Sequence, residues 1–105
     1  DDLRGSPALE IIGRLLEQGA LVQAFDPTVT SADGLPSGTS VALSTTDACA
    51  GADVLVVLTE WDEFRWQDPV ALAEGMNGRA VVDARNILDR ARWQRHGFDY
   101  QGIGR

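Results

Sequence analysis

Five consecutive apolar residues at positions 54–58, Val-Leu-Val-Val-Leu, constrain the fold of this chain more than any other segment. A short apolar run rich in β-branched residues is typical of a strand that is covered on both faces. Such strands occur in parallel sheets, where the connecting helices cover the two faces. The run therefore predicts an α/β domain with a mostly parallel sheet.

Helical and strand patterns alternate on both sides of this run. Strands are predicted at residues 20–25, 41–43, 80–83 and 98–103, and residues 28–39, rich in Thr, Ser, Gly and Pro, are predicted to form a surface loop. Helices are predicted at residues 6–18, 60–65, 68–76 and 89–96, with a further short helix capped by Thr46 or Asp47. This alternation is typical of a doubly wound, Rossmann-like sheet.

Residues with strong capping preferences mark the ends of three helices. Ser, Asp and Asn at the N-cap accept a hydrogen bond from a free backbone N–H group, and Gly after the last turn ends a helix. Proline suits the first helical position, and it follows two of these caps. The predicted caps are Ser6, Asp68 and Asp89 at helix starts, and Gly19 and Gly97 at helix ends.

The chain begins with a helix, whereas the first and central strand of a doubly wound sheet precedes its first helix. We therefore expect the first strand to be missing, and residues 1–105 to be one domain of a longer polypeptide. A chain of 105 residues suits a single domain, since domains commonly have roughly 100–200 residues.

Charge and composition exclude several classes of function. A net charge of −7 argues against nucleic acid as a partner. Residues 1–78 hold three arginines and thirteen acidic residues, a net charge of −10, whereas residues 79–105 hold six arginines and three aspartates, a net charge of +3. A basic C-terminal quarter suits a small anionic ligand. Since no apolar run approaches the ~20 residues of a membrane span, we expect a cytoplasmic protein without a membrane partner.

Ligands of open parallel sheets bind beyond the carboxyl ends of the strands. Arg85 and Asn86 follow the strand predicted at residues 80–83. The guanidinium of Arg85 suits a phosphate, but from position alone a solvated arginine, or one paired with Asp83, is the simpler explanation. Asp26 follows another predicted strand, where it would bind a ribose or form a turn with Pro27.

Other chemically notable residues have structural explanations beside functional ones. An aromatic group after residue 58 suits stacking on a base or capping of the sheet edge; it consists of Trp61, Phe64 and Trp66. The acidic residues of the same stretch have no metal-ligand pattern and are expected to form a solvated face; they are Glu60, Asp62 and Glu63. Because Cys49 is the single cysteine, a disulfide within the chain and a zinc site built from cysteines are excluded. Its side chain is expected to be buried. His96 suits a helix C-terminus.

Several motifs in a fixed order carry a family resemblance. They are residues 1–7 (Asp-Asp-Leu-Arg-Gly-Ser-Pro), 51–53 (Gly-Ala-Asp), 58–64 (Leu-Thr-Glu-Trp-Asp-Glu-Phe), 83–86 (Asp-Ala-Arg-Asn), 97–100 (Gly-Phe-Asp-Tyr) and 102–105 (Gly-Ile-Gly-Arg). Over essentially its whole length the chain resembles the C-terminal, UDP-binding domain of the UDP-glucose/GDP-mannose dehydrogenases. Residues 59–64 look most like the UDP-glucose 6-dehydrogenase branch.

The resemblance implies a role in a two-step, NAD-dependent oxidation of a sugar C6 alcohol to a carboxylate. In the family, an N-terminal domain binds NAD, a central helix dimerises the subunits, and this domain holds the UDP-sugar. The resemblance implies that Arg85 contacts the UDP-sugar and that Arg4 faces the NAD side of the cleft. It implies no catalytic or metal-binding residue in this chain, because Cys49 does not match the family's cysteine motif. The chain alone is therefore expected to be inactive, and the complete enzyme to be a homo-oligomer.

Two departures from the family pattern bear on the site. Ala84 stands where the family usually has glycine, and the Phe-Lys pair that contacts substrate would lie upstream of Asp1. Three alternatives stay open. A sibling enzyme would act on UDP-N-acetylmannosamine, UDP-N-acetylglucosamine or GDP-mannose, and a structural or oligomerisation domain would keep the fold without a ligand site. A phosphoacceptor receiver domain shares the fold but needs a lysine, and all nine basic residues here are arginines.

Overall fold

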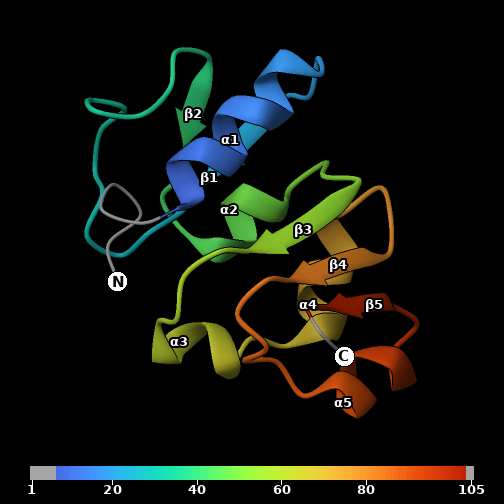
Figure 1. Cartoon of the computed structure of the whole chain (residues 1–105). Coiled ribbons are helices and arrows are strands. Elements are labelled where there is room, and N and C mark those ends of the chain that lie inside the picture. The colour runs from blue at the N-terminus through green and yellow to red at the C-terminus, as the bar shows by residue number, and fades with distance from the viewer. Residues whose placement is uncertain (1–6, 104–105) are drawn as a thin grey trace. The chain divides into compact units, whose positions relative to one another are not determined.

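A computed structural model describes residues 7–103 of the protein, in which helices alternate with parallel strands (Figure 1). The chain divides into two compact units, Asp1–Ala48 and Cys49–Arg105. The elements are, in chain order, α1 (Ala8–Glu17), β1 (Val22–Ala24), β2 (Thr39–Val41), α2 (Thr45–Cys49), β3 (Val54–Val57), α3 (Asp62–Arg65), α4 (Pro69–Gly75), β4 (Ala80–Asp83), α5 (Arg90–Arg95) and β5 (Asp99–Gly102). The predicted α/β class is confirmed, and the described strands form two parallel sheets, β1–β2 and β3–β4–β5.

The first unit consists of α1 and the parallel pair of β1 and β2. Helix α1 buries Ala8 and Ile12, as its apolar spacing predicts. Its N-cap is Pro7, one residue later than predicted, and Ser6 lies outside the described residues. Gly19 follows the helix with a φ of +89°, a left-handed conformation that favours glycine and ends the helix as expected.

Strand β2 begins two residues earlier than the sequence predicts. Thr39 pairs with Val22 of β1, and its hydroxyl donates to the carbonyl oxygen of Pro36 at 2.7 Å. Leu43, in contrast, is 84% exposed and lies beyond the strand. The prediction followed the apolar residues around position 42. The bounds of this strand are set by its pairing with β1, not by side-chain hydropathy.

The second unit is built on a three-stranded parallel sheet in the order β3–β4–β5 (Figure 1). Burial alternates along the middle strand: Val81 and Asp83 are buried, whereas Ala80 and Val82 are only half-buried. The same alternation occurs in β5, where Tyr100 is buried between exposed neighbours. The unit's hydrophobic core therefore lies on one face of the sheet.

The expectation that residues 54–58 form a strand covered on both faces is wrong. Among the described residues, β3 pairs only with β4 and so lies at an edge of its sheet. Val54 is 47% exposed, and Val57 is the only buried residue of the strand. An apolar run does not reveal which strands will be its neighbours, so it cannot distinguish an edge strand from a central one.

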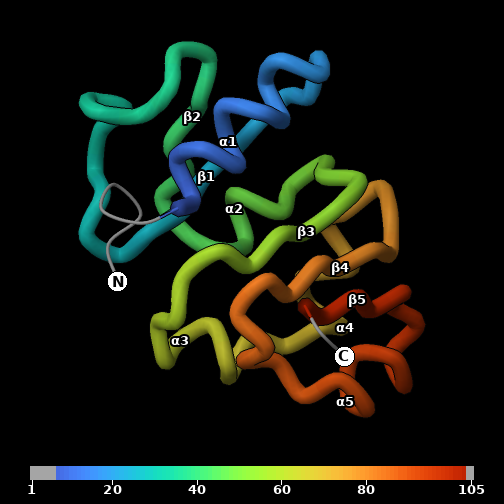
Figure 2. The backbone as a smooth tube through the Cα atoms, viewed as in Figure 1, coloured from blue at the N-terminus to red at the C-terminus, as the bar shows by residue number. Residues whose placement is uncertain are grey.

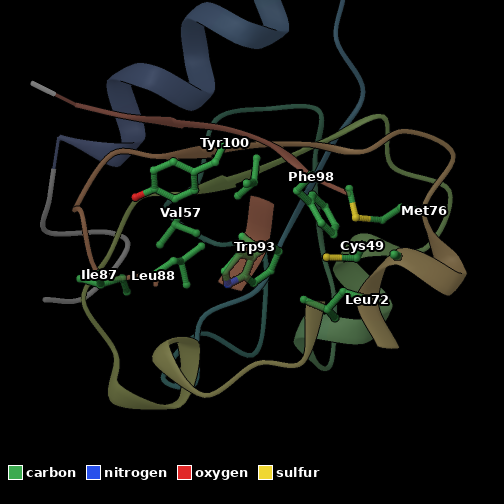
Figure 3. Packing of buried hydrophobic residues seen from close by; sticks show 11 residues of the cluster. Cys49, Val57, Leu72, Met76, Ile87, Leu88, Trp93, Phe98 and Tyr100 are labelled. Carbon is green, nitrogen blue, oxygen red and sulfur yellow. The ribbon is translucent and has the colours of Figure 1, made fainter. Parts of the chain in front are cut away.

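Cys49 and helices α4 and α5 supply side chains that pack in the core of this unit (Figure 3). Trp93 of α5 is 1% exposed and meets Phe98 edge to face, with 4.8 Å between the ring centroids. Cys49 and Leu72 belong to the same cluster. The core thus fixes the positions of the helices that follow β3 and β4.

Side-chain caps bound two helices of this unit as predicted. Asp68 accepts a hydrogen bond from the backbone N–H of Val70 at 2.9 Å, and Asp89 accepts one from Arg92 at 3.2 Å. For α2 the prediction of Thr46 or Asp47 is wrong. The Ser44 hydroxyl, one residue before α2, accepts a hydrogen bond from the backbone N–H of Asp47 at 3.0 Å. It thereby satisfies a free N–H group in the first turn of the helix.

The backbone path brings the carboxyl ends of the three strands to one edge of the sheet (Figure 2). Val57 pairs with Asp83, and Asp83 with Gly102, so the segments after them leave the sheet beside one another. This edge is where α/β proteins commonly bind ligands. No helix in residues 7–103 is long and apolar enough to cross a membrane.

Gly78, two residues before β4, is predicted to be required because the backbone passes close to Asp53 there. A Cβ at this position would lie 2.2 Å from the carbonyl oxygen of Asp53, a backbone atom that cannot give way cheaply. We expect Gly78→Ala to lower the free energy of unfolding by about 1–3 kcal/mol. The control is Gly13→Ala, since a Cβ within α1 meets nothing within 4 Å and should stabilise the protein by about 0.5–1 kcal/mol. Urea unfolding measures both, and a Gly78→Ala variant as stable as wild type would contradict the prediction.

Candidate binding site at the carboxyl edge of the β3–β4–β5 sheet

Three loops meet the carboxyl edge of the sheet, and each contains residues of one of the sequence motifs. Glu60 follows β3, the Arg85–Asn86 pair follows β4, and Ile103 follows β5. These loops are neighbours because their strands pair in parallel register. The order of the strands in the sheet therefore brings the residues of the candidate site together.

The side chain of Asp83 anchors the loop that follows β4. Asp83 is fully buried, at 0% exposed, and its Oδ2 accepts hydrogen bonds from the backbone N–H of Leu88 at 2.8 Å and from the hydroxyl of Tyr100 at 2.9 Å. Its Oδ1 accepts the backbone N–H of Arg85 at 3.3 Å. In Figure 3 the Tyr100 oxygen lies on the side of the core where Leu88 is labelled. One carboxylate thus holds both ends of residues 85–88.

Asn86 ties the same loop to the end of β5. Its Nδ2 donates to the carbonyl oxygen of Ile103 at 2.7 Å, and its Oδ1 accepts the Ile103 backbone N–H at 3.0 Å. Its φ is +56°, a left-handed conformation that asparagine tolerates better than most residues. Together with Asp83, these bonds fix the backbone on both sides of Arg85.

The guanidinium of Arg85 meets the carboxylate of Glu60. Nε of Arg85 donates to Oε1 of Glu60 at 2.9 Å, and Nη2 donates to the same oxygen atom. The hydrogen bond from Arg85, and then its charge, hold the pKa of the Glu60 carboxyl below its usual value. The contact therefore favours the ionised form of Glu60.

Sequence reasoning missed this partner of Arg85. It offered Asp83 as the paired acid and assigned Glu60 to a solvated face. The signal lay in the spacing, because Glu60 comes three residues after the end of β3 and Arg85 two residues after the paired end of β4. Reading it needed the β3–β4 pairing, which periodicity alone does not supply.

Asp26 has a structural role in the first unit. It is 1% exposed, and its Oδ1 accepts both the backbone N–H of Thr28 at 2.8 Å and the Thr28 hydroxyl at 2.7 Å. Of the two interpretations of this residue, these bonds support the turn.

The three aromatic residues near α3 do not share one environment. Phe64 packs against the hydrophobic core of the second unit, whereas Trp66 is 79% exposed. Trp61 is the N-cap of α3 and is half-buried. The three residues therefore do not act as one group, since Phe64 contributes to the core and Trp66 is exposed.

The remaining candidates offer no catalytic centre. Cys49 is 1% exposed, and burial raises the pKa of its thiol to about 11, so the reactive thiolate is disfavoured. His96 is the exposed C-cap of α5, as expected. Within residues 7–103 no group of His, Cys, Asp and Glu side chains suits a metal ion. Arg4, expected on the NAD side of a cleft, lies outside the described residues.

Comparisons with known proteins add a family to this geometry. The sequence model of the UDP-glucose/GDP-mannose dehydrogenase family, UDP binding domain, matches residues 1–90. The chain is similar over its full length to the UDP-glucose 6-dehydrogenases of Rhizobium meliloti strain 1021, at 41% identity, and of Pseudomonas aeruginosa PAO1, at 39%. It is also 35% identical to a putative UDP-glucose 6-dehydrogenase of Bacillus subtilis strain 168. The chain covers 24%, 25% and 24% of these three relatives, about a quarter of their length.

Substitution of Asn86 should separate its two contributions to the loop. Asn86→Ala and Asn86→Gly both lose the two hydrogen bonds to Ile103, so we expect each to lower the free energy of unfolding by about 1–2 kcal/mol. Asn86→Ala should be the less stable of the two, because alanine is strained at a φ of +56° and glycine is not. Urea unfolding gives both values, and equal stability of the alanine variant and wild type would refute this role.

Proposed function

Since this chain belongs to the UDP-glucose/GDP-mannose dehydrogenase family, we propose that it is the UDP-sugar-binding domain of an NAD-dependent UDP-glucose 6-dehydrogenase. One observation carries the proposal: Arg85 stands at the carboxyl edge of a parallel sheet, on a loop fixed by hydrogen bonds at both ends. A guanidinium in that position suits the pyrophosphate of a nucleotide sugar. The branch rests on the similarity of the whole of this chain to about a quarter of two UDP-glucose 6-dehydrogenases and of one putative UDP-glucose 6-dehydrogenase.

The proposed mechanism of this domain is positioning. Arg85 donates charge-assisted hydrogen bonds to a phosphate of UDP-glucose, and Asp83 and Asn86 keep the backbone of its loop from moving. Fixing the pyrophosphate orients the sugar toward reacting groups on the rest of the polypeptide, which lowers the entropic part of the barrier. The buried Cys49, with its raised pKa, supports placing the nucleophile outside this chain.

The described residues do not fit NAD as a ligand of this domain alone. The sequence has no G-x-G-x-x-G motif, which would bring a backbone close to a dinucleotide pyrophosphate. Asp26, the acid at a ribose-type position, is buried and bonded to Thr28. We therefore assign NAD to other parts of the complete enzyme, with Arg4 as the residue of this chain expected to face it. A homo-oligomeric complete enzyme in the cytoplasm belongs to the same proposal.

Arg85→Ala tests the proposed site in the complete protein. Loss of charge-assisted hydrogen bonds, worth about 1.5–3 kcal/mol, should weaken UDP-glucose binding roughly 10- to 150-fold. Arg95→Ala is the matched control: it removes the same charge from the last turn of α5, which leads to the opposite edge of the sheet. Calorimetric titration with UDP-glucose, UDP-N-acetylmannosamine and GDP-mannose measures both variants and identifies the preferred sugar nucleotide.

Four outcomes are informative. Selective binding of UDP-glucose that is lost in Arg85→Ala and kept in Arg95→Ala supports the branch and the residue. Preference for another sugar nucleotide keeps the family and changes the substrate. Wild-type affinity in Arg85→Ala contradicts the assignment of Arg85, and binding of none of the three compounds leaves a structural domain as the better description.

A further inference from the structure

The contact between Arg85 and Glu60 uses a part of the guanidinium that suits a phosphate. Nε and Nη2 form one of the two edges on which a guanidinium makes paired, parallel hydrogen bonds to an anion. Both of these nitrogen atoms donate to Oε1 of Glu60. The Glu60 carboxylate therefore occupies one of the two edges through which the Arg85 guanidinium could bind the phosphate of the proposed ligand.

The geometry of this contact favours its replacement. A phosphate offers two oxygen atoms in the spacing of the guanidinium fork, whereas both bonds from Arg85 converge on a single oxygen of Glu60. A diphosphate also carries more negative charge than one carboxylate. The side chains of Arg85 and Glu60 are 31% and 42% exposed, so water reaches the pair and can solvate the carboxylate when it leaves. Exposed pairs of this kind are weak.

We propose that Glu60 is a specificity-determining residue that competes with the ligand's phosphate for Arg85 and yields that edge of the guanidinium to a diphosphate. The inference rests on the proposed function, because it assumes that Arg85 binds the ligand. A ligand with a single carboxylate carries the same charge as Glu60, so it gains at most the second oxygen contact. A diphosphate gains the second oxygen contact and, because of its larger negative charge, a stronger charge interaction as well. Glu60 thereby makes Arg85 selective for phosphate, at some cost in affinity.

Glu60→Gln tests this competition in the complete protein, with UDP and uridine as probes in calorimetric titrations. The substitution keeps the size of the side chain and removes its charge. UDP should bind roughly two- to fivefold more tightly, and uridine, which has no phosphate, should bind as in wild type. Glu63→Gln is the matched control, since it removes the same charge from an exposed side chain of the neighbouring α3, and it should leave UDP affinity unchanged.

A double substitution separates this inference from the proposed function. If Glu60 acts through Arg85, the gain from Glu60→Gln should vanish in an Arg85→Ala background. Unchanged or weaker binding of UDP to Glu60→Gln would overturn the inference, and weaker binding would identify Glu60 as a brace for Arg85. Failure of the proposed function is a different result: Arg85→Ala alone would then bind UDP as wild type does.

Discussion

The carboxylate of Asp83 is buried at the end of β4, where an oxygen atom without hydrogen-bond donors would destabilise the fold considerably. Its donors come from three places: the start of the following loop at Arg85, the end of that loop at Leu88, and Tyr100 on the neighbouring strand. Satisfying the carboxylate therefore requires the loop to close over it and β5 to lie beside β4. The requirement of one buried side chain thus sets the conformation of the candidate site.

The exposed electrostatics of the site depend on this buried anchor. Hydrogen bonds to Asp83, and from Asn86 to Ile103, fix the backbone of residues 85–88. The guanidinium of Arg85 therefore lies at the carboxyl edge of the sheet, beside Glu60. The segment 79–105 carries six arginines against three aspartates, although the whole chain has a net charge of −7. A rigid loop with a cation at its tip, in a locally basic segment, suits a compact anion better than an extended one.

Local chemistry predicted much of the fold, and pairing decided the rest. Asp68, Asp89 and Gly97 act where the sequence placed them, because a cap depends on its own few neighbours. The edge position of β3 among the strands of residues 7–103 and the start of β2 could not be predicted, since both depend on which strands pair. The site shows the same division. Arg85 could be identified from its position after a strand, but its pairing with Glu60 and the burial of Asp83 depend on contacts between segments distant in sequence.

A crystal structure of the complete protein with UDP would test most directly whether the anchored loop serves to hold a phosphate. We expect a phosphate oxygen within about 3.2 Å of the Arg85 guanidinium, the hydrogen bonds of Asp83 to Leu88 and Tyr100 unchanged, and the Glu60 carboxylate turned away. UDP bound through other residues, with Arg85 still donating to Glu60, would contradict it.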